Sequence, residues 1–246
     1  MLKKCLLIFA GVLLCSATLK AQEFSVNVEG GVAAFTRNDV RIPNEGGTRF
    51  DMLNLIGEEA RPYFRIKTGI QLGAKHQVFL LYAPLQVSGR GFLSQNTFFE
   101  ADQFSAEEEV KGTYRFSNYR LSYRYTFLEN DKWELGVGAT AFIRDAKVQL
   151  EQGGLKEKNT DLGFVPLLHL FAGYSLNEQF QLVLDGEGLL GAQGRAFDAA
   201  LMLNYRAFDN WSFQGGYRIL EGGADVDEVF NFATAQFFFA GLSFAF

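Results

Sequence analysis

The chain has 246 residues, of which 48% are hydrophobic, and it carries a formal net charge of −5. This acidic balance disfavours nucleic acid as a partner, because binding to phosphates needs a basic surface. No segment after residue 21 offers the roughly 20 consecutive apolar residues that a helical membrane span requires.

The first 21 residues have the pattern of a cleaved secretory signal peptide. Lys3 and Lys4 form a positively charged start, residues 6–14 form an apolar core, and residues 17–21 form a short exit of mostly polar and small residues. We expect cleavage after Ala21. Such a signal directs the chain out of the cytoplasm.

The mature chain is then residues 22–246. A lipoprotein signal that ends at Cys15 is the alternative, although Leu14 is bulkier than the small residue that such signals place there. Loss of residues 1–21 removes both cysteines and three lysines, which leaves 20 basic and 28 acidic residues and a net charge of −8. Without cysteine, the mature chain has neither a disulfide nor a thiol nucleophile.

The mature chain divides into about ten segments in which apolar and polar residues alternate, separated by turn residues. Alternation with a period of two is typical of β-strands that have one apolar and one polar face. The segments are, roughly, 23–35, 61–72, 77–88, 109–128, 132–149, 161–176, 179–190, 195–208, 211–221 and 229–246. Short connections at 73–76, 129–131, 177–178 and 209–210 alternate with longer ones at 36–60, 89–108, 150–160 and 222–228, while 191–194 is a short connection on the side of the long ones. This layout predicts an all-β fold, an antiparallel transmembrane β-barrel of about ten strands, with eight as the rival count.

The charged residues fall on the polar face of these strands, where a barrel would place its lumen. In the second segment Phe64 and Ile66 would face lipid, and Arg65 and Lys67 would face inward. Because isolated charges in a low-dielectric interior are costly, we expect the lumenal charges to pair with one another or with water. The predicted lumenal network comprises Glu29, Arg65, Lys67, Arg120, Arg124, Glu134, Arg144, His169, Asp185, Glu187, Asp198, Arg206 and Arg218.

Aromatic residues gather next to the short connections, as in the interfacial girdle of a membrane protein. Trp133 and Trp211 each begin a segment directly after a short turn. The other members are Tyr125, Phe127, Tyr174, Phe180, Tyr205 and Phe208. A soluble β-sandwich is the alternative, but it would bury its apolar face and expose its charges.

The fourth segment changes phase along its length. Leu121 and Tyr123 lie on its outward face, whereas Tyr114 and Phe116 are in the opposite phase. We therefore expect a β-bulge near residues 117–118.

The last connection and the connection at 89–108 carry two further candidates. Asp225, Asp227 and Glu228 cluster beside glycines and are a weak metal candidate, because hard cations favour oxygen-rich loops. Their spacing does not match an EF-hand, so a solvated acidic loop is favoured. The loop 89–108 carries four phenylalanines that could fold over the mouth of the barrel. We expect no cofactor, because phosphate-binding glycine loops and zinc-ligand spacings are missing.

The final residues, 241–246, alternate again and end in phenylalanine. This ending resembles the recognition signal by which bacterial outer-membrane proteins are passed to their insertion machinery. Gly241 matches the glycine of that signal, and Phe244 and Phe246 match the apolar residues three and five positions later. Phe239 stands where a polar residue is usual.

Over the whole mature chain, the layout is similar to that of the small OmpA-like and OmpW-like outer-membrane β-barrels of Gram-negative bacteria. The resemblance implies a location in the cell outer membrane, with both mature termini in the periplasm. It also implies partners, namely the barrel-insertion machinery, outer-membrane lipid and lipopolysaccharide, and it leaves the ligand unknown. The omptin proteases also have ten strands, but the chain lacks a matching Asp-Xaa-His pair.

His169 is the most suggestive residue for chemistry. If residues 176–178 form a hairpin loop, His169 lies opposite Asp185, with Glu187 diagonally near. A histidine beside a carboxylate is the orienting half of a nucleophilic triad. The nucleophile is missing, because Phe171 stands where outer-membrane lipid A deacylases have a serine. A histidine in a structural hydrogen-bonded pair is the favoured interpretation.

Three functions follow from these features. The first is a non-enzymatic barrel with a structural, binding or small-solute role, whose lumen is largely filled by side chains. The second is a lipid-modifying enzyme that uses His169. The third is binding or passage of a small hydrophobic molecule, which predicts a lateral or apical apolar pocket.

Overall fold

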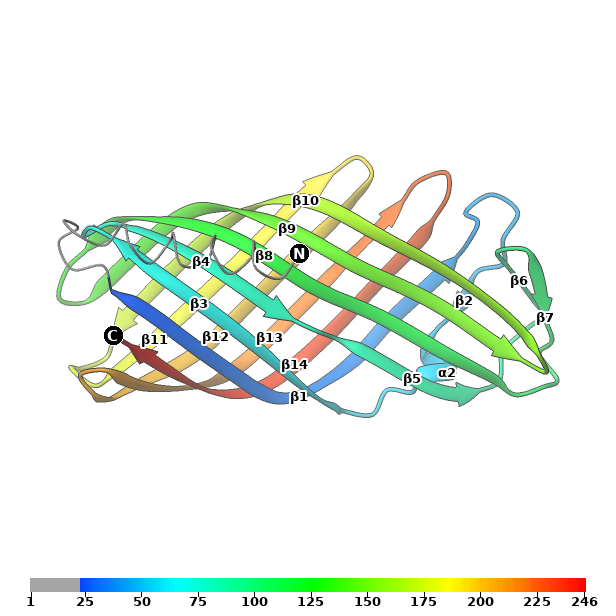
Figure 1. Ribbon diagram of the computed structural model, residues 1–246, viewed down its shortest axis with the longest axis horizontal. Coiled ribbons are helices and arrows are strands. Elements are labelled where there is room, and N and C mark those ends of the chain that lie inside the picture. The colour runs from blue at the N-terminus through cyan, green and yellow to red at the C-terminus, as the bar shows by residue number, and fades with distance from the viewer. Residues whose placement is uncertain (1–22) are drawn as a thin grey trace, which may run out of the picture.

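The computed structural model describes residues 23–246, and these form a closed antiparallel β-barrel of ten long strands (Figure 1). The strands are β1 (Phe24–Arg41), β3 (Arg61–Leu72), β4 (His76–Ala83) with its continuation β5 (Gln86–Gly91), β8 (Val110–Glu129), β9 (Trp133–Gln152), β10 (Leu155–Ser175), β11 (Phe180–Gly191), β12 (Gly194–Phe208), β13 (Trp211–Asp225) and β14 (Phe230–Ala245). The short elements β2 (Phe50–Asp51), α2 (Leu53–Ile56), β6 (Thr97–Phe99) and β7 (Asp102–Phe104) lie at one end. The prediction of an all-β, ten-stranded barrel is confirmed, and the rival count of eight is wrong. The expected signal peptide, residues 1–21, lies outside the described residues.

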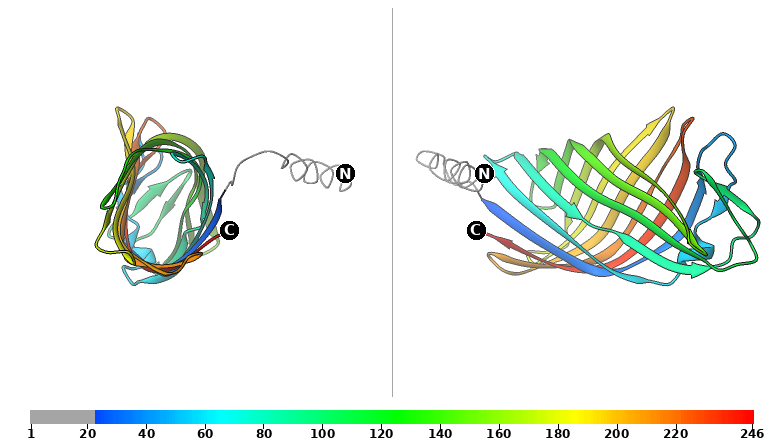
Figure 2. Two further views of the ribbon diagram at one scale, coloured as in Figure 1. Left: turned by 90° about the vertical axis from the view of Figure 1, so that its left-hand side faces the viewer. Right: turned by 45° about the vertical axis from the view of Figure 1, so that its right-hand side comes forward.

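The barrel closes by pairing its first and last strands. β1 and β14 run antiparallel over their whole length, and Phe24 and Phe246 exchange backbone hydrogen bonds of 3.0 and 2.8 Å. The start and the end of the described chain therefore lie together at one end of the barrel, here called the terminal end (Figure 2). The opposite end, which carries the cap described below, is the loop end.

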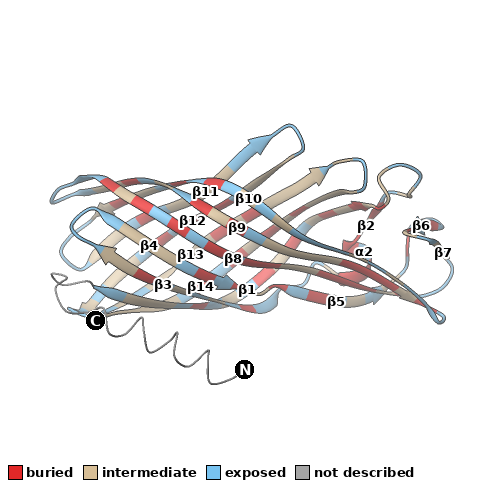
Figure 3. Ribbon diagram, turned by 45° about the horizontal axis from the view of Figure 1, so that its top comes forward, coloured by how far each residue is buried: buried red, intermediate tan, exposed pale blue. Residues whose placement is uncertain are grey.

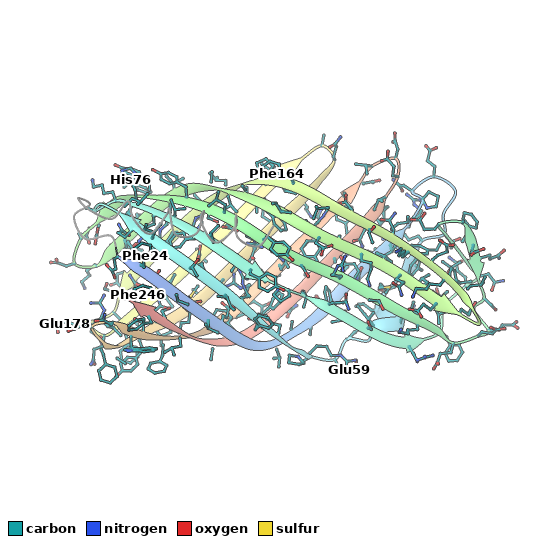
Figure 4. The ribbon with its side chains drawn as sticks, in the orientation of Figure 1. Phe24, Glu59, His76, Phe164, Glu178 and Phe246 are labelled. Atoms are coloured by element: carbon teal, nitrogen blue, oxygen red, sulfur yellow. The ribbon has the colours of Figure 1, made fainter. Side chains whose placement is uncertain are left out.

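Apolar side chains cover the outside of the ring. They alternate along each strand with side chains that point inward. Phe164 is 67% exposed and Phe238 is 62% exposed, and Figure 4 places Phe164 on the outer wall. Exposed apolar surface on this scale suits lipid rather than water. No helix in the described part of the chain is long and apolar enough to cross a membrane.

Aromatic pairs follow the terminal end of the outer wall. Trp133 packs on Tyr174 at a ring-centroid distance of 4.8 Å, and Trp211 packs on Phe244 at 4.6 Å. A third pair, Phe180 and Tyr205, stacks at 4.9 Å. Five of the eight aromatic residues predicted for the girdle take part in these pairs, next to the short turns.

The predicted long connection at 150–160 is wrong. Gly153 and Gly154 have φ angles of +55° and +103° and form a two-residue turn between β9 and β10. Positive φ at both positions suits glycine and closes a tight hairpin. The polar residues on either side therefore stay in strands that extend well beyond the apolar wall. The connection at 222–228 is also shorter than predicted, because β13 continues to Asp225.

The predicted bulge at residues 117–118 is wrong as well. Pairing of β8 with β9 keeps one register from Lys111 to Thr126, and the register shifts only after Thr126. Tyr114 therefore points into the barrel, where it is 1% exposed and meets Phe35 edge-on at 5.3 Å. The inward face of β8 changes from polar to apolar along the strand because the barrel interior is polar near the terminal end and apolar near the loop end.

The apolar interior is closed by two connections at the loop end: α2 packs inside the wall, and β6 and β7 lie at its rim (Figures 1 and 2). We call residues 42–60 and 92–109 the cap. Its main apolar side chains are buried to 3% exposure or less: Ile42, Phe50, Met52, Leu55, Ile56, Leu93, Phe99 and Phe104. Figure 3 shows buried residues along α2 and β6 at this end. The cap closes the lumen with a packed hydrophobic core.

The barrel wall has a seam between β3 and β5. Pairing of β3 with β4 stops at Ile66 opposite Tyr82, and β5 pairs only with β8. Pro62 and Pro84 stand at the residues where pairing would otherwise continue. Proline has no N–H to donate to a β-ladder, so it interrupts the pairing there.

The cap approaches the wall closely at Gly91, which we expect to tolerate no side chain. A Cβ at Gly91 would lie 2.0 Å from the backbone oxygen of Asn54, a residue of α2. Gly91→Val should therefore displace the cap and lower the temperature at which the barrel unfolds on an unboiled denaturing gel. Gly186→Ala is the matched control, because nothing lies within 4 Å of its added Cβ. Equal melting of the two variants would contradict the inward position of α2.

Candidate functional site

The lumen between the terminal end and the cap contains a polar cavity of about 300 Å³. Eleven of the thirteen residues predicted for the lumenal network line it. They come from β1, β3, β8, β9, β10, β11, β12 and β13, so the cavity is enclosed by strands from every side of the ring. Its lining begins near the terminal end with polar, partly exposed residues: Ser25, Gln77, Gln181, Gln214 and Ser243.

Asp198 is the centre of the inner layer of this cavity. Its carboxylate accepts a hydrogen bond of 2.8 Å from Arg218, and the guanidinium groups of Arg120 and Arg65 lie 2.7 and 3.4 Å away. The Asp198 side chain is only 2% exposed. One buried carboxylate therefore joins three guanidinium groups from three strands.

Glu29 and Glu187 extend this layer in both directions. Glu29 accepts hydrogen bonds from Arg218 at 3.0 Å and from the Tyr63 hydroxyl at 2.7 Å. Glu187 pairs with Arg120 and accepts a hydrogen bond of 2.6 Å from Thr140. We call Glu29, Arg65, Arg120, Glu187, Asp198 and Arg218 the ion-pair layer. It balances three carboxylates with three guanidinium groups, so each buried charge is compensated.

Hydroxyl groups complete the layer. The alternation in the sequence places Ser122 and Thr140 on the inward faces of their strands, but the predicted network includes neither of them, nor Tyr63. Tyr63, Ser122 and Thr140 are all at most 8% exposed and each donates to a carboxylate of the layer. Tyr63 shares the inward phase of Arg65 on β3, and Ser122 shares that of Arg120 and Arg124 on β8. The phase of the strand indicates that these hydroxyl groups face inward, but the residue type alone does not, because a hydroxyl can occupy a lumenal or a lipid-facing position.

A second set of contacts lies nearer the terminal end. Lys67 pairs with Asp185 at 3.4 Å, and Arg124 pairs with Glu134 at 3.3 Å. The Arg124 guanidinium also lies 3.6 Å from the ring centroid of Phe171, a cation–π contact that the sequence did not suggest. These contacts compensate the cationic side chains of this part of the lumen.

His169 lies 2.7 Å from Asp185, between its Nε2 and a carboxylate oxygen. The predicted partnership is therefore present, but the predicted register is wrong by two residues. His169 stands directly opposite Glu187, and Asp185 stands opposite Phe171. The hairpin is longer than expected because Asn177 accepts hydrogen bonds from the backbone N–H groups of Gln179 and Phe180.

The environment of His169 offers no nucleophile. Its side chain is 3% exposed, and its Nδ1 is buried without a hydrogen-bond partner among the described residues. A triad needs a hydroxyl or thiol within about 2.6–3.2 Å of the free imidazole nitrogen. The geometry supports a structural pair.

The remaining candidates lie elsewhere. Arg144 pairs with Asp161, toward the loop end, and Arg206 is exposed at the rim of the terminal end. Asp225 accepts a hydrogen bond of 2.8 Å from Asn44. Within residues 23–246, no group of three or more acidic, histidine or cysteine side chains is arranged to hold a metal ion, so Asp225, Asp227 and Glu228 are not brought together as a site.

Removal of the Asp198 charge should be strongly destabilising. Asp198→Asn leaves buried guanidinium groups uncompensated, and such losses cost about 3–5 kcal/mol. The control is Asp161→Asn, whose carboxylate is 47% exposed and whose pair with Arg144 is worth about 0–1 kcal/mol. Urea unfolding of the barrel in detergent measures both. A loss at Asp198 no larger than at Asp161 would reject the ion-pair layer as a stabilising centre.

The His169–Asp185 pair should behave as a structural pair. His169→Gln keeps a donor for Asp185 and should leave the unfolding midpoint nearly unchanged. Asp185→Leu leaves Lys67 and His169 without their carboxylate and should cost about 1–3 kcal/mol. The same unfolding measurement compares the two. A larger effect of His169→Gln than of Asp185→Leu would contradict the structural assignment.

Comparison with known proteins identifies the fold. No family model and no curated protein matches the chain. Among solved structures, the outer membrane protease OmpT from Escherichia coli aligns with 11% identity and a TM-score of 0.51, over 94% of this chain and 99% of that one. Ail, the attachment invasion locus protein of Yersinia pestis, aligns with 10% identity and a TM-score of 0.42, over 92% and 100%. An outer membrane channel from Pseudomonas putida F1 aligns with 9% identity and a TM-score of 0.43, over 94% and 97%.

At these identities the likeness concerns the fold alone. The OmpT structure, with a TM-score of 0.51, is an outer membrane protein, as the sequence pattern predicted for this fold. Together with the closed ring and the apolar outer wall, the comparison shows that this chain has the fold of the small Gram-negative outer-membrane β-barrels.

Proposed function

We propose that the protein is an integral outer-membrane β-barrel with a closed lumen and a non-enzymatic, structural or binding role. The observation that carries this proposal is the double closure of the lumen. The ion-pair layer crosses the middle of the barrel, and the cap fills the loop end. A ten-stranded barrel encloses little more than its own side chains require, so these two layers leave no continuous path for a solute.

The membrane placement rests on the outer wall. Exposed apolar side chains surround the ring, and aromatic pairs border them at the terminal end. Short turns at the terminal end and a large cap at the other match the usual arrangement of short periplasmic turns and longer outer loops. We therefore place the terminal end in the periplasm and the cap at the cell surface.

A non-enzymatic role agrees with the chemistry of the lumen. Its charges are paired, and His169 has its Nε2 on Asp185 and no nucleophile at Nδ1. The polar cavity of about 300 Å³ is at the lower end of the sizes of ligand sites. A small polar solute or ordered water suits it better than a lipid substrate of a lipid-modifying enzyme.

Binding of a small hydrophobic molecule is a second candidate function, favoured by the seam. The seam between β3 and β5 lies beside Tyr63 and Leu85, which belong to the apolar core of the loop end. A ligand from the membrane could reach that core without crossing the ion-pair layer. Retention of a radiolabelled hydrocarbon by the purified barrel would favour this candidate, and loss of retention when the seam is closed by a disulfide would assign the route.

Conductance tests the closed lumen. In planar bilayers the purified barrel should give conductance far below that of a general diffusion porin, because both the ion-pair layer and the cap block the path. Replacement of residues 43–57 by a short glycine–serine linker opens only the outer closure and should leave the conductance low. Porin-level conductance of the unmodified barrel would refute the proposal.

Cysteine labelling tests the orientation. Glu45 is exposed in the cap, and Asp131 is exposed in a turn at the terminal end. Glu45→Cys should react with a membrane-impermeant thiol reagent in intact cells, and Asp131→Cys should react only after the outer membrane is permeabilised. The reverse pattern would overturn the orientation and leave the fold intact.

A further inference from the structure

The outer wall of β8, β9 and β10 carries a cluster of basic side chains just beyond its apolar part. In the strand register Arg115 stands directly opposite Lys147, and Lys111 and Lys156 stand on either side of Glu151. Lys158 stands opposite Gln149, between these two rows. We call Lys111, Arg115, Lys147, Lys156 and Lys158 the basic patch. It is notable on a chain whose expected mature form carries a net charge of −8.

The patch is only partly neutralised. Arg115 pairs with Asp145 at 2.7 Å, and Glu151 is shared between Lys111 and Lys156 at 3.3 and 3.7 Å. Among the residues that the structure describes, neither Lys147 nor Lys158 has a carboxylate within 4.0 Å. Five cations therefore face two carboxylates, and two ammonium groups are available to an anion.

These side chains point away from the lumen. On β9 the neighbouring residues Val148 and Leu150 are buried inside the barrel, at 5% and 0% exposure. Lys147 and Glu151 therefore lie on the outward phase of the same strand. The patch belongs to the membrane-facing side of the barrel and not to its interior.

An apolar groove of about 480 Å³ lies on the same wall, nearer the terminal end. Thr68 and Ala141 contribute small side chains to its lining, and Tyr82, Tyr119 and Phe164 contribute aromatic rings. Ile143 lines the groove and precedes Lys147 by four residues on the same face of β9, a distance of about 13 Å along the strand. Groove and patch thus lie on one face of the same strand.

We propose that the groove and the basic patch together bind one phosphorylated glycolipid of the lipid A type. An acyl chain lies in the groove, and the phosphates lie on Lys147, Lys158 and Arg115. The site rests on the membrane placement proposed above, since that placement puts the patch at the boundary of the outer leaflet, where lipopolysaccharide is found. Basic clusters at a membrane boundary attract anionic headgroups, and an acyl chain is the occupant that an apolar groove facing lipid requires.

The charge arm of the test uses Lys147→Gln combined with Lys158→Gln. Affinity for hexa-acylated lipid A is measured on the purified barrel in detergent, by microscale thermophoresis. The double variant should bind at least roughly tenfold more weakly. Lys75→Gln combined with Lys132→Gln, which removes two exposed lysines at the terminal end, is the control and should bind like the unmodified barrel. Equal affinity of both double variants would overturn the proposal.

The groove arm uses Ala141→Trp, which places a bulky side chain in the groove. It should weaken binding of lipid A, whereas Ala199→Trp, on β12 outside the groove, should not. Phosphatidylglycerol replaces lipid A in a parallel titration. If the lysine variants weaken both lipids equally, the patch recognises negative charge in general and the assignment to lipid A is wrong.

If the proposed placement in the membrane is wrong, the experiments give a result that differs from failure of the lipid site alone. Each variant is first tested for heat-modifiable migration on a denaturing gel, which a folded barrel shows and a soluble protein does not. If the unmodified chain forms no heat-modifiable barrel, the proposed function fails. If the barrel forms and binds no lipid A, the lipid site alone fails. Should the double variant not fold, Lys158→Gln alone, at an exposed position, supplies the charge test.

Discussion

The structure depends on one carboxylate that three guanidinium groups share inside a ring of strands. Asp198 joins Arg65, Arg120 and Arg218, and these connect onward to Glu29 and Glu187. The layer therefore links β1, β3, β8, β11, β12 and β13 across the lumen. Charges buried so deeply are tolerable only when every member is paired, so the same contacts that close the lumen also fix how the strands face one another. The cap can then pack on a wall whose shape is already set.

Strand number, closure and the direction of most side chains could be predicted from the sequence. Alternation of Phe64 and Ile66 with Arg65 and Lys67 fixes which face is lumenal, because a period of two leaves no intermediate choice. Pairing of particular charges could not be predicted, because it depends on how neighbouring strands slide past one another. The His169 hairpin illustrates this: the Asn177 side chain lengthens the turn and moves the register by two residues.

The apolar interior near the loop end could not be predicted from the sequence, and the reason is physical. The opposite phase of Tyr114 and Phe116 predicts a bulge only if the lumen is polar throughout, as is usual in a transmembrane barrel. The cap supplies an apolar interior instead, so β8 keeps its phase while its inward face changes from polar to apolar and its outward face carries Lys111 and Arg115. The residues of the cap itself follow no period, so nothing in the sequence indicates that α2 lies inside the ring. The seam at Pro62 and Pro84 could have been anticipated, since proline interrupts a β-ladder.

The central claim is that the cap is packed inside the barrel, and hydrogen exchange of its backbone amides tests that most directly. The N–H groups of Met52, Leu55, Ile56 and Gly57 donate to backbone oxygens at 2.8 to 3.0 Å, and the side chains beside them are buried. Exchange measured by mass spectrometry on the barrel in lipid nanodiscs should therefore be as slow for residues 52–57 as for the strands around them. Complete exchange of this segment within seconds, at the rate of the exposed turn at 176–179, would show that the cap lies outside the lumen and would contradict the account.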